Sequence, residues 1–390
     1  MTNSLLKKFI RNNAIVFILL NSAGLFSYIF QVVLGRTLPP DQYGSFNSLL
    51  ATGALITTPI TILHLVFSRF IARINVQKLQ HIKSLLTISL KFILCIALGI
   101  FLIGLSFSPW LKNFLNTETT LPIILMLLAA CFSSFQQIFI AVCEGMQRFL
   151  SLGMISGGGA LAKILFAVLF VVIFGWGVEG GLLALSFATF SALAYGIWQL
   201  QDVFKVQAVD LHSSSLMEMA RFSIPSFFMI TMVSIMCNID IILARHYCLP
   251  DQAGYYATAT ILGRIAFFLP SSLLMVLFPS VAKATVSGSK DNHYLWVSLG
   301  LTFILSGGVF LVFFIAGQSI IQLFYGEQYY SAVPILEIVS AAMGLLAMSH
   351  VIFSYNMARS EFGFLWPLFG GVTLMLSLVF LYHDSPETIA

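Results

Sequence analysis

Long apolar runs, separated by short polar breaks, dominate the chain from Ala14 to Leu381. Each run has about 20 residues, the length at which an α-helix crosses the hydrocarbon core of a bilayer. The first run lacks a small-residue cleavage site, so it is expected to remain as a helix. The pattern predicts about eleven transmembrane helices near residues 14–34, 46–67, 84–108, 121–143, 151–175, 179–200, 222–244, 253–279, 295–317, 331–356 and 362–382.

Composition supports this pattern and excludes a water-soluble fold. Of the 390 residues, 59% are hydrophobic and only 9% are charged, whereas soluble domains carry about 25% charged residues. Four of the five cysteines, Cys95, Cys131, Cys143 and Cys237, lie within or at the ends of apolar runs, where they typically pack as small apolar side chains. The predicted fold class is therefore an all-α integral membrane protein without a disulfide framework.

The basic residues are distributed unevenly among the polar breaks. With the N-terminus in the cytoplasm, thirteen of the 19 Lys and Arg residues lie inside and only Arg36, Lys112 and Arg245 lie outside, while Lys91, Lys163 and Arg264 fall within helices. Positive residues concentrate on the cytoplasmic side of membrane proteins. The inside residues are Lys7, Lys8, Arg11, Arg69, Arg73, Lys78, Lys83, Arg148, Lys205, Arg221, Lys283, Lys290 and Arg359.

One sequence block occurs twice. Gln31–Arg36 matches Asp240–Arg245, and Pro40–Gly44 (PDQYG) matches Pro250–Gly254 (PDQAG). Six predicted helices separate the copies, so both have the same orientation in the membrane. This predicts two parallel, pseudo-symmetric lobes, residues 1–205 (helices 1–6) and 206–390 (helices 7–11), an arrangement typical of transporters.

Several motifs together resemble one family, the polysaccharide and O-antigen flippases of the multidrug/oligosaccharidyl-lipid/polysaccharide exporter superfamily. The resemblance covers nearly the whole chain, although such proteins usually have twelve or more helices and the eleven predicted here leave the closure of the second lobe open. The motifs are Leu34–Phe46, Glu144–Phe149, Phe174–Gly181, Asp240 with Gly254–Ala257, and Phe324–Ala332.

The resemblance implies a protein of the bacterial inner membrane that transports polysaccharide precursors by alternating access. Its substrate would be a lipid-linked oligosaccharide carried on undecaprenyl pyrophosphate, and a polysaccharide polymerase is a candidate partner. In this family, helices 1, 2, 7 and 8 line a central cavity between the lobes.

Polar residues on these four helices are the candidate substrate-binding residues. Arg264 lies near mid-membrane, where a cation is costly unless it meets water or an anion, and its guanidinium could bind a pyrophosphate. Alternatively, Arg264 pairs only with Asp240 or with backbone carbonyls, and His64 is a hydrogen-bonded packing residue. The full set is Asn21 and Gln31 on helix 1, Thr61 and His64 on helix 2, Asp240 on helix 7 and Arg264 on helix 8.

Other function classes fit less well. No HExxH sequence, paired metal-ligand spacing or phosphate loop is present, so no cofactor, metal or nucleic acid is predicted. A multidrug/cation antiporter of the same superfamily is the second candidate. A membrane-embedded glycan polymerase or ligase would need a large outer loop, and every predicted outer break is short. We therefore expect a transporter and not an enzyme, with the sugar and the coupling ion left open.

Overall fold

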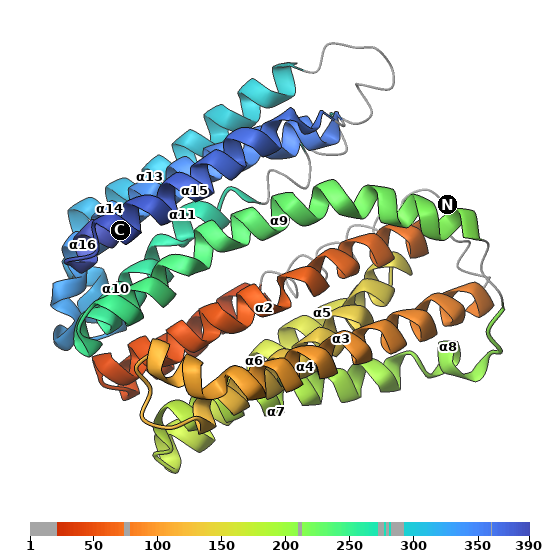
Figure 1. Cartoon of the computed structure of the whole chain (residues 1–390), viewed down its shortest axis with the longest axis horizontal. Helices are drawn as coiled ribbons and strands as arrows, with labels where there is room; N and C mark the ends of the chain where they lie inside the picture. Colours follow the sequence, from red (N-terminus) through yellow and green to blue (C-terminus); the bar gives the residue numbers. More distant parts are fainter. Residues whose placement is uncertain are drawn as a thin grey trace, which may run out of the picture. The chain divides into compact units, whose positions relative to one another are not determined.

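The computed structural model describes residues 22–73, 79–209, 213–271, 277, 281, 292–359 and 361–390. These residues form helices and connecting turns, and no strand occurs among them (Figure 1). The long helices are residues 22–37, α2 (Pro40–Arg73), α3 (Leu79–Phe114), α4 (Leu121–Gly145), α7 (Gly177–Gln199), α9 (Ser213–Tyr247), α10 (Pro250–Gly263), α13 (Asn292–Phe324), α14 (Val333–Ala358) and α15 (Leu365–Leu381). The shorter elements are α5 (Phe149–Gly153), η1 (Met154–Gly158), α6 (Gly159–Ala167), η2 (Val168–Ile173), α8 (Gln201–Lys205), α11 (Ile265–Phe268), η3 (Glu327–Ala332), η4 (Phe362–Phe364) and α16 (Pro386–Ile389).

Nine helical segments in the described part of the chain are long and apolar enough to cross a membrane. Large apolar side chains on them are exposed, including Ile315 and Trp366, each at 81%, which suits a surface that meets lipid. The prediction of an all-α, multi-pass membrane protein is confirmed. The predicted spans 14–34 and 253–279 extend beyond the described residues, so the count of eleven stays a prediction.

Two helices begin earlier than hydropathy predicted. The spans predicted at 46 and 253 begin at Pro40 and Pro250. Proline is favourable in the first helical turn because its fixed φ is already helical and its missing N–H is not needed there. Asp41 and Asp251 add a carboxylate to each first turn, which the helix dipole stabilises. The polar PDQ sequence therefore begins each helix and is not part of a loop.

The chain divides into two compact units. The described residues up to Leu38 and from Gly53 to Phe227 form the first, in which α4 packs against α3 and α7, and α6 packs against α7. Pro39–Thr52 and Phe228–Ala390 form the second, in which α14 packs against α10 and α13. The helix α2 thus contributes its first turns to one unit and its remainder to the other. The prediction that residues 1–205 and 206–390 are two duplicated lobes is not tested by this division and stays a prediction.

The two matched sequence blocks contact each other within the second unit. A Cβ atom added to Gly254 would lie 2.0 Å from the carbonyl oxygen of Pro40, and one added to Gly44 would lie 2.7 Å from the amide nitrogen of Gly254. Neither position has room for a side chain, so glycine permits this close backbone crossing. Arg245 supports it by donating from Nη1 to the carbonyl oxygen of Asp41 at 3.3 Å.

Candidate functional site

Two of the predicted site residues, Asp240 and Arg264, lie close together in the second unit. Asp240 comes from α9, and Arg264 follows the last residue of α10. Arg264 Nη2 is 4.0 Å from Asp240 Oδ1, and the two side chains are only 15% and 11% exposed, respectively. The hydroxyl of Tyr256 on α10 donates to Asp240 Oδ2 at 3.2 Å. These contacts form a buried polar cluster between α9 and α10, which we call the Asp240–Arg264 cluster.

The position of Arg264 results from a break in the predicted eighth helix. Arg264 is both the C-terminal cap of α10 and the N-terminal cap of α11, so the helix predicted from 253 to 279 is not continuous at this point. Its Nη2 also donates to the carbonyl oxygen of Cys237. The structure therefore contains the pairing with Asp240 and with a backbone carbonyl that was the alternative to substrate binding.

Polar atoms of this cluster retain hydrogen-bonding capacity. Arg264 Nε and Asp240 Oδ1 are buried, and neither has a hydrogen-bond partner within the described residues. A guanidinium can donate through both edges, so the contact with Cys237 does not exhaust Arg264. Binding of substrate by Arg264 and Asp240 stays a prediction.

His64, predicted on helix 2, takes part in a second cluster, in the first unit. His64 Nε2 is 2.9 Å from Glu144 Oε2, and His64 Nδ1 is 3.1 Å from the carbonyl oxygen of Gln137. Both partners belong to α4. In the sequence, Glu144 stands out only as the first residue of a corner motif, because hydropathy cannot pair residues 80 positions apart.

The remaining predicted residues do not join either cluster by a described contact. Thr61 is exposed on α2, one turn before His64, and Gln31 is half-buried in the helix over residues 22–37. Asn21 lies outside the described residues. Substrate binding by these three residues remains a prediction.

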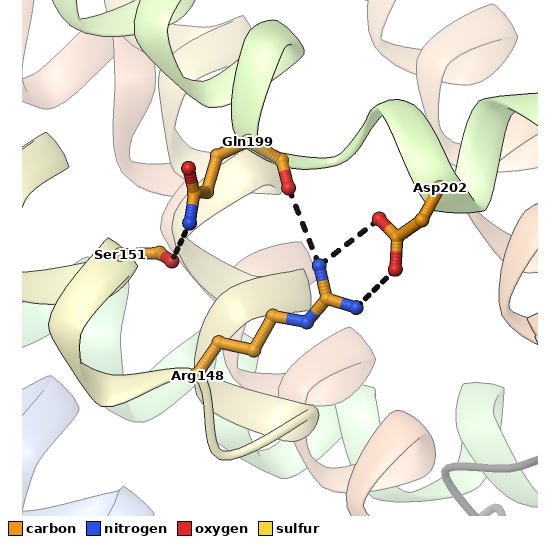
Figure 2. A network of polar contacts seen from close by, with 4 residues as sticks. All are labelled: Arg148, Ser151, Gln199 and Asp202. Carbon is orange, nitrogen blue, oxygen red and sulfur yellow. Dashed lines mark hydrogen bonds and ion pairs between the residues drawn. The ribbon is translucent and has the colours of Figure 1, made fainter.

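A third polar cluster ties the corner after α4 to the end of α7 (Figure 2). Arg148 donates from Nη1 to Asp202 Oδ1 at 3.0 Å and to the carbonyl oxygen of Gln199 at 3.2 Å, while its Nη2 donates to Asp202 Oδ2. Gln199 Nε2 in turn donates to the hydroxyl of Ser151 at 2.7 Å. The paired hydrogen bonds of a guanidinium and a carboxylate fix their relative orientation.

The ion pair between Arg148 and Asp202 also changes the pKa of both side chains. The hydrogen bond from Arg148 lowers the pKa of Asp202 below its ordinary value, and the hydrogen bond to Asp202 raises the pKa of Arg148. Both side chains are partly exposed, at 28% for Arg148 and 44% for Asp202, so solvent screens the pair. Its geometry indicates a structural role for Arg148, which the sequence indicates only as a cytoplasmic basic residue and as part of the Glu144–Phe149 motif.

Within the described part of the chain, no group of three or more His, Cys, Asp or Glu side chains could hold a metal ion. The three clusters described above each contain one acidic and one basic side chain.

Comparisons with known proteins place the chain in a family. The family model described as "Polysaccharide biosynthesis protein" matches residues 10–285, well over half of the chain. No individually curated protein matched the chain.

Solved structures share the fold. An inward-facing multidrug resistance MATE family transporter of the MOP superfamily aligns with a TM-score of 0.80 and 12% identity, over 94% of this chain and 89% of that one. The lipid II flippase MurJ, in an inward closed conformation, aligns with a TM-score of 0.71 and 12% identity, over 96% and 83%. The MATE multidrug transporter DinF-BH aligns with a TM-score of 0.66 and 15% identity, over 96% and 89%. The MATE- and MurJ-like fold is confirmed, and the chain belongs to the polysaccharide biosynthesis protein family.

Proposed function

We propose that this transporter is a flippase that moves a lipid-linked oligosaccharide, carried on undecaprenyl pyrophosphate, across the bacterial inner membrane by alternating access. The observation that carries the proposal is the match of residues 10–285 to the polysaccharide biosynthesis protein family. A lipid carrier would keep a sugar substrate at the bilayer, where a multi-pass membrane protein can reach it. The likeness in fold to a lipid II flippase agrees with this proposal.

The Asp240–Arg264 cluster supplies the chemistry that such a substrate needs. A pyrophosphate is a compact dianionic group, and arginine binds phosphate oxygens through paired, charge-assisted hydrogen bonds. In the described structure, Arg264 Nη2 is 4.0 Å from Asp240 Oδ1, which is too long for a hydrogen bond. Arg264 Nε has no hydrogen-bond partner within the described residues. We propose that the pyrophosphate competes with Asp240 for this guanidinium during transport.

The second candidate is a multidrug/cation antiporter, which the MATE-like fold favours. In that case Asp240 would be the main binding residue, because a cationic substrate is attracted by a carboxylate and repelled by Arg264. The two candidates therefore assign opposite roles to the same pair of side chains.

Deletion of the gene in the bacterium distinguishes the flippase from the antiporter. We expect loss of surface polysaccharide and accumulation of the lipid-linked oligosaccharide in the inner leaflet, with unchanged efflux of a cationic dye such as ethidium. Complementation with Arg264→Lys is expected to be partial, since it keeps the charge but loses the planar fork. A strain with normal polysaccharide but impaired dye efflux would contradict the flippase and support the antiporter.

A further inference from the structure

The pair formed by His64 and Glu144 belongs to the first compact unit, whereas the Asp240–Arg264 cluster belongs to the second. It joins α2 to α4, and its side chains are 19% and 46% exposed, respectively. We propose that His64 and Glu144 form a binding site for a single proton, and that this proton holds α2 against the end of α4. The inference concerns proton binding alone and does not depend on the transported substrate.

The two ring nitrogens of His64 have different partners. A backbone carbonyl only accepts hydrogen bonds, so the contact at 3.1 Å with the Gln137 oxygen requires a hydrogen on Nδ1. In a neutral imidazole with Nδ1 protonated, Nε2 has only a lone pair. The carbonyl of Gln137 thus selects the tautomer.

The second contact then requires one more proton. An unprotonated Nε2 and an ionised carboxylate would place two lone pairs 2.9 Å apart, which is repulsive. One proton between Nε2 and Oε2 turns the contact into a hydrogen bond, either as imidazolium with carboxylate or as imidazole with carboxylic acid. Because both forms contain the same number of protons, the site binds one proton whichever group holds it.

The surrounding packing holds the two groups in register. The Ser68 hydroxyl on α2 also hydrogen-bonds the Glu144 carboxyl. Next to Glu144, a Cβ atom on Gly145 would lie 2.6 Å from Ile71 Cβ and 2.8 Å from the Ser68 carbonyl oxygen, so α4 ends directly against α2. A change in the contact between His64 and Glu144 therefore acts on two helices that are already in close contact.

Two charged groups on the neighbouring elements have described partners other than Glu144. On the corner after α4, Arg148 is bound by Asp202 and Gln199. On α3, Lys83 lies over the ring of Phe204, with Nζ 4.4 Å from the ring centroid. The helix α2 itself carries Arg69 and Arg73 further along. In the described structure, the Glu144 carboxyl is hydrogen-bonded by His64 and Ser68.

Loss of the proton has a defined structural consequence. His64 cannot move its remaining hydrogen to Nε2 without giving up the bond to the Gln137 carbonyl, so deprotonation breaks one of its two contacts. Because Pro40–Thr52 at the start of α2 belongs to the second unit, this proton controls the attachment of a helix that enters both units.

Distances between spin labels on α2 and α5 test the proposal in the full-length protein. Labels are placed at Ala72 and Leu150, both exposed, after replacement of the five cysteines. The protein is reconstituted in lipid nanodiscs at pH values from about 5 to about 8, the interval in which a histidine side chain ordinarily changes charge. We expect a narrow distance distribution at low pH that broadens or shifts at high pH.

Variants separate proton binding from ordinary packing. In Glu144→Gln the amide can donate to a neutral Nε2, so the narrow distribution should persist at every pH. In His64→Ala the distribution should be broad at every pH, and Glu179→Gln, the same change at the start of α7, should behave like the wild type. A wild-type distribution that does not change with pH, or a Glu144→Gln variant that remains pH-dependent, would overturn the proposal.

Discussion

Removing the charge of Arg264 separates the stabilising role of the Asp240–Arg264 cluster from substrate binding. In Arg264→Met, the Asp240 carboxylate keeps the hydrogen bond from Tyr256 but loses its only described cation within 4.0 Å. Breaking a buried ion pair by removing one partner costs about 3 kcal/mol or more, because the remaining charge is buried without compensation. Arg264→Met is therefore expected to lower the thermal unfolding midpoint of the protein in detergent.

The double variant Asp240→Asn/Arg264→Met makes the test specific. It removes both charges, while the introduced asparagine amide can still accept a hydrogen bond from Tyr256, so we expect most of the lost stability to return. If Arg264 binds pyrophosphate, this stable double variant should still fail to restore surface polysaccharide. A single variant as stable as the wild type would refute the energetic reasoning, and a double variant with normal polysaccharide would refute the binding role.

Three further predictions concern the fold and its orientation. Gly254→Ala should destabilise the protein, because its Cβ would lie 2.0 Å from the Pro40 carbonyl oxygen, whereas the control Gly300→Ala has no atom within 4 Å of its Cβ and should not lower the thermal midpoint. Asp202→Asn should lower the free energy of unfolding by at most about 1 kcal/mol, because the pair is partly exposed. The folded-state pKa of Asp202 is lowered from 3.8. The wild-type protein should therefore be more stable than the variant above that pH, and this difference should vanish as the pH falls through the lower folded-state pKa. Single cysteines near Asn116 and Gln328 should react with a membrane-impermeant maleimide from outside the cell while one near Ser214 should not. Equal labelling at Ser214 would overturn the predicted topology.

Much of the fold could be predicted from the sequence because the bilayer imposes one strong rule, a run of about 20 apolar residues for each crossing helix. The runs near 84–108, 121–143 and 179–200 fall within α3, α4 and α7 to within one residue. Hydropathy alone placed two helix starts at 46 and 253, whereas the repeated PDQ block, which opens each helix, marks the earlier starts at Pro40 and Pro250. It also missed the break at Arg264, since Gly263 and Arg264 interrupt an apolar run without ending it.

The site was only partly predictable for a physical reason. An ionisable residue in an apolar run is conspicuous because burial in the membrane is costly, and Arg264 and Asp240 were selected on that basis. Partner choice depends on tertiary packing between helices, which places Glu144 beside His64 across 80 positions and Asp202 beside Arg148 across 54. The family resemblance was needed to connect these residues with polysaccharide.

The flippase assignment is tested most directly by measuring translocation in proteoliposomes. Undecaprenyl pyrophosphate bearing an oligosaccharide with a fluorescent group on the sugar would be incorporated in both leaflets, and an impermeant reductant would quench the outer fraction. The purified protein should make the protected inner fraction accessible, and Asp240→Asn/Arg264→Met should leave it protected. Protection equal to that of protein-free liposomes, with the wild-type protein folded and inserted, would contradict the proposed function.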